Sequence, residues 1–220
     1  AAVGVWVDVG ARNEDASLNG ISHVLEHMAF KGTERRNALQ IAEEIEAVGG
    51  HLNAYTSREQ TAYFARILKN DLPLAVDILA DILQNSTFAA EELERERTVI
   101  IQEIGQTKDT PDDLVFEHFQ LAAYPDQPLG RSILGTEEHV SRFARTTLQD
   151  YMGTHYRGPG MVLAAAGGVD HEQLVDLATK AFDSLPSDRG NQVLKAQYQG
   201  GQHFEECALE QVHYLMGFEG

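Results

Sequence analysis

Near its start, the chain reads His23-Val24-Leu25-Glu26-His27. Residues three and four apart in an α-helix are surface neighbours, so this spacing places two imidazoles and one carboxylate on one helix face. The apolar residues between and after them would turn toward a hydrophobic core. The stretch therefore predicts an amphipathic helix with three chemically active side chains on its polar side.

Two histidines one turn apart can bind the same metal ion. Neutral imidazole suits Zn²⁺, and a catalytic zinc site has three protein ligands and one position left for water. A carboxylate beside such a site can act as general base toward water, and Glu26 would do so here. The alternative is three polar residues on a solvated helix face, because five-residue matches also arise by chance. A third ligand would favour the metal site.

A charged amphipathic helix is predicted over residues 89–106, and it offers that ligand. Glu96 and Glu103 are seven residues apart, close to two turns, so they share a face. Glu103 has apolar neighbours and needs a partner, which a metal ion would provide. Glu96 is expected to orient a ligand histidine or the water by hydrogen bonding. The alternative is a solvated helix with intrahelical ion pairs. Its buried side is expected to carry Leu93, Val99, Ile100 and Ile104.

Several separate motifs, in one order along the chain, resemble a single family. They read SHVLEHMAFKGT (22–33), GGHLNAYTSRE (49–59), ERER (94–97), DQPLGR (126–131) and MVLAAAG (161–167). The family is that of the pitrilysin-type inverted zincins, in which His-x-x-Glu-His reverses the more common His-Glu-x-x-His. Within it, the motifs are most similar to the β subunit of mitochondrial processing peptidases and its bacterial homologues.

The resemblance implies a zinc-dependent peptidase site. Its metal ligands would be His23, His27 and Glu103, with one zinc ion per site. Glu103 follows His27 by 76 residues, a spacing similar to the family's own. Glu26 would be the general base and Glu96 a second functional glutamate.

The resemblance also implies contacts with a peptide or protein substrate. In processing peptidases, the aromatic residue at the place of Phe30 lines the pocket for the residue after the cut. Acidic residues at the places of Asp113 and Glu117 are associated there with an arginine just before the cleaved bond. The alternatives are a core position for Phe30 and ordinary surface carboxylates for the other two.

Relatives bind the substrate backbone along an edge strand, and residues 52–56 match it, including Asn53, Ala54 and Tyr55. Main-chain hydrogen bonds to such a strand hold an extended peptide whatever its sequence. The preceding Gly49-Gly50 pair would permit a tight turn into the strand. A simple hairpin arm is compatible with the same residues.

Composition narrows the class of protein. The chain has 220 residues, of which 43% are hydrophobic and 23% charged, enough to bury a sizeable core. Its longest apolar run is too short to span a bilayer, so no membrane insertion is expected. A formal charge of −17 disfavours nucleic acid; it would attract basic peptides or simply serve solubility. The single cysteine, Cys207, fits a reducing compartment and a small packing role. We expect a bacterial cytoplasm, or the mitochondrial matrix if a targeting segment has been lost.

The predicted fold class is α+β, with helices packed on one face of a mainly antiparallel sheet. Strands are expected near residues 3–9, 51–56, 61–68, 161–166 and 212–218. Helices are expected near residues 19–29, 37–48, 71–85, 89–106, 112–122, 145–156 and 171–182. The resemblance implies the same fold, as the N-terminal half-unit of a pitrilysin-type enzyme.

Relatives of full length contain a second, similar half that encloses the substrate chamber. We therefore expect residues 1–220 to be a single N-terminal peptidase domain, with the second homologous domain absent from this chain or supplied by another subunit. Alone, this chain would bind zinc but hydrolyse peptides poorly. Two alternatives to a processing enzyme stay open at this point: a peptide-degrading oligopeptidase, and a non-catalytic structural subunit of a heteromeric peptidase.

Overall fold

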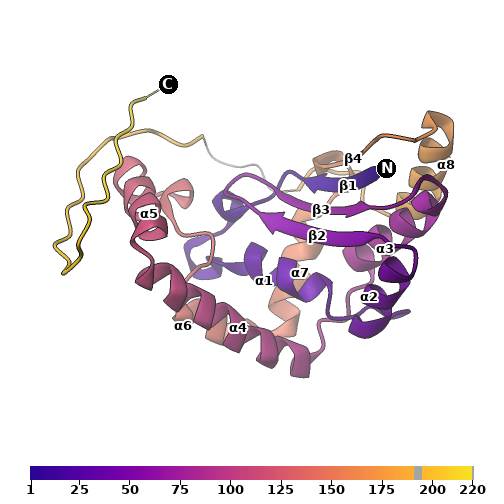
Figure 1. The fold of residues 1–220 in the computed structure, drawn as a ribbon, viewed down its shortest axis with the longest axis horizontal. Coiled ribbons are helices and arrows are strands. Elements are labelled where there is room, and N and C mark those ends of the chain that lie inside the picture. Colours follow the sequence, from indigo (N-terminus) through magenta and orange to yellow (C-terminus); the bar gives the residue numbers. More distant parts are fainter. Residues whose placement is uncertain (191–194, 220) are drawn as a thin grey trace.

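A computed structural model describes residues 1–190 and 195–219, and one antiparallel sheet lies at its centre (Figure 1). Its strands are β1 (Ala2–Val7), β2 (His51–Thr56), β3 (Thr61–Arg66) and β4 (Met161–Ala166). They are ordered β2-β3-β1-β4, so β2 and β4 form the two edges. Every neighbouring pair is antiparallel, which confirms the expected sheet type.

The helices agree closely with the predicted ranges. They are α1 (Ile21–Ala29), α2 (Ala38–Ala47), α3 (Leu72–Gln84), α4 (Ala90–Asp109), α5 (Pro111–Ala123), α6 (Glu137–Arg142), α7 (Arg145–His155) and α8 (His171–Phe182). Only α6 was not predicted, because six residues are too few for a helical period to stand out. Its start is nevertheless capped, since the Thr136 side chain accepts a hydrogen bond from the His139 N–H.

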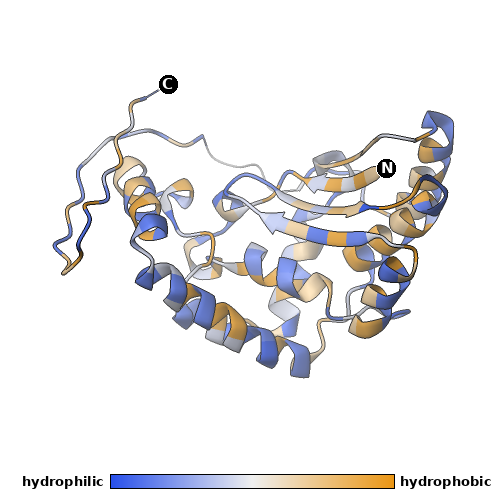
Figure 2. Cartoon of the chain, viewed as in Figure 1, coloured by the Kyte–Doolittle hydropathy of each residue, from blue (hydrophilic) through white to orange (hydrophobic). Residues whose placement is uncertain are grey.

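One face of the sheet is covered and the other is open. Val3, Val5 and Val7 of β1 are buried, whereas Val162 on the outer side of β4 is 61% exposed. Helix α1 lies against β2, and α3 lies against β1. Figure 1 shows α1 and α7 beneath the sheet, with α4 passing below α1. In Figure 2, α3 is largely hydrophobic and α4 largely hydrophilic, as expected for an inner and an outer helix.

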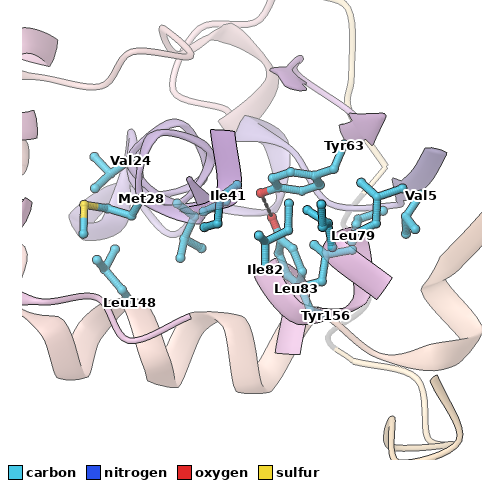
Figure 3. Packing of buried hydrophobic residues seen from close by; sticks show 14 of the residues in the cluster. Val5, Val24, Met28, Ile41, Tyr63, Leu79, Ile82, Leu83, Leu148 and Tyr156 are labelled. Atoms are coloured by element: carbon cyan, nitrogen blue, oxygen red, sulfur yellow. Dashed lines mark hydrogen bonds between the residues drawn. The ribbon is translucent and has the colours of Figure 1, made fainter. Parts of the chain in front are cut away.

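The hydrophobic core packs against the apolar side of α1. Val24 and Met28 of α1 are fully buried and lie near Leu148 of α7 (Figure 3). Farther along the core, the hydroxyls of Tyr63 and Tyr156 share a hydrogen bond of 3.1 Å. Buried aromatic hydroxyls need such a partner, and this pair joins β3 to the end of α7. The polar face of α1 is therefore held in a fixed direction, toward α4.

Three sequence predictions were wrong. Residues 212–218 form no strand, and their alternating apolar side chains are all more than half exposed, because no described strand lies beside them to pair with their backbone. Val99 is 46% exposed, since Ile100 and Ile104 fill the inner side of α4. Cys207 is exposed and has no packing role. The strands β1 and β3 also end two residues earlier than expected.

No helix among the described residues is both long enough and apolar enough to cross a membrane.

Candidate metal centre

The polar face of α1 and the inner face of α4 bring the three predicted metal ligands together. Nε2 of His23 and Nε2 of His27 each lie 3.6 Å from the same Glu103 oxygen, Oε2. The three potential ligand atoms all lie within 4.8 Å of one another. The His23 side chain is 8% exposed and that of Glu103 is 42% exposed, so the cluster is closed toward the core and open on the Glu103 side.

The geometry and the donor set fit a zinc ion. A separation of 3.6 Å is too long for a hydrogen bond. Zinc bonds of about 2.0–2.2 Å at tetrahedral angles would place neighbouring ligand atoms roughly 3.4 Å apart. Two imidazole nitrogens and one carboxylate are also a ligand set that zinc takes in catalytic sites.

His23 is kept uncharged by its surroundings. Burial, followed by the proximity of His27, lowers the pKa of His23 to about 3. At neutral pH its ring therefore has a nitrogen lone pair available for a metal. The other nitrogen, Nδ1, is buried and has no hydrogen-bond partner among the described residues. Packing around the ring and the position of its helix backbone therefore set its orientation.

His27 is oriented by Glu96 instead. Nδ1 of His27 lies 3.0 Å from Oε2 of Glu96, and Nζ of Lys31 lies 2.7 Å from Oε1. Burial opposes the charged form of Glu96, but the hydrogen bonds from Lys31 and His27 outweigh it and hold the pKa below its usual value. An ionised carboxylate only accepts hydrogen bonds, so the proton of His27 sits on Nδ1. Nε2, which faces Glu103, is left free to bind a metal.

Glu26 lies between the cluster and the edge strand. Burial raises the pKa of Glu26, hydrogen bonding to Thr56 at the end of β2 partly offsets this, and the nearby charge of Glu103 raises it further. Glu26 is thus a carboxylate that holds a proton more readily than a surface glutamate. Such a group can accept a proton and return it.

The edge strand β2 runs above α1, and the two elements are in contact (Figure 1). One side of β2 pairs with β3, and within the described residues its other side has no neighbouring strand. Asn53 and Tyr55 point to the exposed side of the strand and Ala54 is half-buried. Gly49, in the turn before β2, has a φ of +68°, a left-handed conformation that glycine adopts without strain.

The remaining predicted substrate residues lie outside the cluster. Phe30 follows α1, is half-buried and packs against the core, with its ring centre 6.5 Å from that of Tyr63. Glu117 on α5 forms an ion pair of 3.1 Å with Arg58. Asp113 lies in the first turn of α5, where the helix dipole stabilises a carboxylate.

Sequence reasoning missed two residues, one beside the cluster and one at the start of α1. Lys31 lies four residues after His27, a helical spacing that could have suggested a role beside it. Glu14 is 1% exposed and accepts hydrogen bonds from the start of α1. It lies too far before the helix to match any standard capping pattern, and only the folded chain brings it there.

Comparison with known proteins places this chain in a family. The family described as Insulinase (Peptidase family M16) matches residues 1–137, more than half of the chain. The chain belongs to peptidase family M16. A second M16 description, Peptidase M16 inactive domain, matches residues 142–220. In the structure these two segments share one sheet, because β4 of the second pairs with β1 of the first.

Relatives of this M16 chain include proteins that are named as proteases. It is 46% identical over 219 residues to an "uncharacterized zinc protease" of Rickettsia felis, a match that covers 100% of the chain and 53% of that protein. It is 52% identical over 189 residues to human mitochondrial-processing peptidase subunit beta, covering 86% of the chain and 39% of that subunit. The chain thus spans about half the length, or less, of these relatives.

Solved structures share the fold. A protease from Helicobacter pylori superposes with a TM-score of 0.81 at 24% identity, covering 89% of this chain and 48% of that one. Pitrilysin superposes with a TM-score of 0.76 at 24% identity, covering 86% of this chain and 21% of that one. At this identity the likeness concerns the fold, and it confirms the predicted half-unit of a pitrilysin-type architecture.

Proposed function

We propose that this M16 chain is the zinc-binding part of a metalloendopeptidase of the processing-peptidase type, with Glu26 as its general base. The observation that carries the proposal is the convergence of two imidazole nitrogens on one carboxylate oxygen, each at 3.6 Å. A neutral His23 and an oriented His27 support it, because both are needed to bind a cation.

The chain's own residues would divide the work of peptide hydrolysis. A zinc ion held by His23, His27 and Glu103 would supply Lewis-acid activation of water and of the substrate carbonyl. Glu26 would accept a proton from the attacking water and return it to the leaving amine, a task that its raised pKa suits. Glu96 and Lys31 would keep His27 in its binding orientation.

The substrate backbone would lie along β2. An extended peptide added to this edge would hydrogen-bond through its main chain, and its scissile bond would lie beside Glu26 at the Thr56 end of the strand. We propose basic, presequence-like peptides as substrates, because the chain carries a net charge of −17 and one relative is a processing-peptidase subunit. Cleavage of mixed sequences without preference would instead favour an oligopeptidase.

We further propose that residues 1–220 form one N-terminal domain and work with a second homologous domain or subunit. The greater length of the relatives supports this arrangement. A cytoplasmic location stays a prediction.

Replacing Glu26 with Gln tests the function. The variant should keep one zinc per chain and lose peptide hydrolysis by about 10²–10⁴-fold, because only the proton transfer is removed. Zinc is measured by elemental analysis, and hydrolysis by cleavage of a fluorogenic basic peptide, with and without a second M16 half. Glu43→Gln, an exposed change on α2, is the control. Unchanged hydrolysis by Glu26→Gln would overturn the assignment, and zinc binding without any hydrolysis in the wild type would favour a structural subunit.

A further inference from the structure

A buried carboxylate outside the metal cluster contacts the first turn of α1. Glu14 is 1% exposed, and its side chain accepts three hydrogen bonds from groups that precede or open the helix. Oε2 accepts from the backbone N–H of Gly20 at 2.8 Å and from Nδ2 of Asn19 at 3.0 Å. Oε1 accepts from the backbone N–H of Ser22 at 2.9 Å.

These contacts replace a cap that α1 lacks. The first N–H groups of a helix have no partner within the helix, and a side chain at the N-cap position usually accepts from one of them. In α1 the N-cap residue is Gly20, which has no side chain and a φ of +97°. Glu14 supplies the missing acceptor from six residues upstream, and the positive end of the helix dipole favours its charge.

Asn19 and the backbone of Glu14 connect the start of α1 to a distant loop. Nδ2 of Asn19 also donates to the backbone oxygen of Ser132 at 2.9 Å, and the guanidinium of Arg131 donates to the backbone oxygen of Glu14. The 131–135 loop is thereby joined to the start of α1. The same loop also packs closely against Gly20, because a Cβ on Gly20 would lie 2.7 Å from the Leu134 oxygen.

The turn that Glu14 holds contains a metal ligand. Ser22 immediately precedes His23, and Nδ1 of the His23 ring has no hydrogen bond to any residue that the structure describes. The direction of this ring therefore depends on packing and on the position of the helix backbone. His27, one turn later, has its own hydrogen bond to Glu96 and does not share this dependence.

We propose that Glu14 is a positioning residue of the metal site, which fixes the first turn of α1 and through it the imidazole of His23. The proposal rests on the proposed function only in taking zinc as the ion held by His23, His27 and Glu103. Glu14 itself touches neither the ion nor the substrate.

The test is Glu14→Gln, in which an amide N–H₂ replaces one acceptor and faces N–H donors. Burial raises the pKa of Glu14 to about 7, so measurements are made at pH 8, where the carboxylate is ionised. Zinc affinity is measured by competition with a chromophoric chelator, and ligand geometry by the visible spectrum of the Co²⁺-substituted chain. We expect zinc affinity to fall by about 10–100-fold and the Co²⁺ bands to shift.

Asp81→Asn is the matched control. Asp81 is also 1% exposed and also accepts several hydrogen bonds, from Thr33, Arg36 and Asn85, but it lies on α3. This variant should lose stability and keep the wild-type zinc affinity and Co²⁺ spectrum. If Glu14→Gln does not fold, Glu14→Asp, which withdraws the carboxylate by one methylene, should show a smaller change in the same direction.

The outcomes separate this proposal from the proposed function. A wild-type chain that binds no zinc would contradict the function itself. Normal zinc binding by the wild type, with unchanged affinity and spectrum in the Glu14 variants, would overturn only the role of Glu14. Equal losses in the Glu14 and Asp81 variants would overturn it as well, because they would show a general effect of stability.

Discussion

At the scale of single residues, the uncharged state of His23 is a consequence of burial that can be measured. The folded chain lowers the pKa of His23 to about 3, against 6.5 in an unfolded chain. Above pH 6.5 neither state binds the proton. As the pH falls from 6.5 toward 3, only the unfolded state takes it up, so this residue makes the zinc-free fold progressively less stable in that window.

Replacing His23 with Gln isolates this effect. In zinc-free protein, the stability advantage of the wild type over His23→Gln should shrink by about 2 kcal/mol between pH 7 and pH 5. Urea unfolding at the two pH values measures it, and the variant retains every other titrating group, so their contributions cancel. A difference that stays constant with pH would mean that His23 is not held neutral by the fold.

Which residues could be predicted depended on how local their partners are. Helical spacing was enough to predict a site at His23, Glu26 and His27. Glu103 was predicted from its apolar neighbours and from the resemblance of the chain to the family. Glu14 could not be predicted, because its partners are backbone N–H groups that reach it only after the chain turns back through Gly20. Phe30 could not be placed either, since an aromatic residue at a helix end suits a pocket or a core equally well.

At the scale of the element, α1 depends on the unusual backbone at its start. Gly20→Ala should destabilise the chain by about 2 kcal/mol or more, because the new Cβ meets the Leu134 oxygen at 2.7 Å and the residue must keep a positive φ. Thermal or urea unfolding measures the loss. Gly105→Ala in α4 is the control, since a Cβ there meets nothing within 4 Å and should be neutral or stabilising by up to about 1 kcal/mol. Equal effects at the two positions would refute the strain argument.

Helices and strands were predicted well where the hydrophobic pattern is long and the hydrogen-bond partners of the backbone lie nearby. The helices α3 and α8 match their predicted ranges to within one residue at each end, because apolar residues recur at helical spacing and Asp170 caps the start of α8. Residues 212–218 have an equally clear strand period, yet a strand forms only where a neighbour accepts its hydrogen bonds. Alternation of apolar and polar residues indicates which side chains would share a face of a strand. It does not show that a neighbouring strand is present.

At the scale of the whole molecule, the site is open. The Glu103 side of the cluster reaches solvent, and the chain spans about half the length, or less, of its relatives. Water exclusion and substrate alignment, which both contribute to catalysis, would need a facing wall. The fold class could be read from the sequence because it depends on the order of elements, whereas the domain or subunit that we propose to face the site cannot be read from these 220 residues.

This openness leads to a kinetic prediction. Purified, monomeric 1–220 with a full complement of zinc should hydrolyse a basic fluorogenic peptide slowly, and addition of a second M16 half should raise kcat/KM by at least about tenfold through alignment and water exclusion. Steady-state kinetics with and without that half measure the change, with bovine serum albumin as the protein control. Rapid turnover by the monomer alone would contradict it.

We propose that His23, His27 and Glu103 together hold one zinc ion. The most direct test of this proposal is the zinc content of the purified chain after dialysis against metal-free buffer, compared with that of Glu103→Gln. We expect one zinc per wild-type chain and a content near zero in the variant, with both proteins folded by circular dichroism. A wild type without zinc, or a Glu103→Gln chain that keeps it, would contradict this metal site.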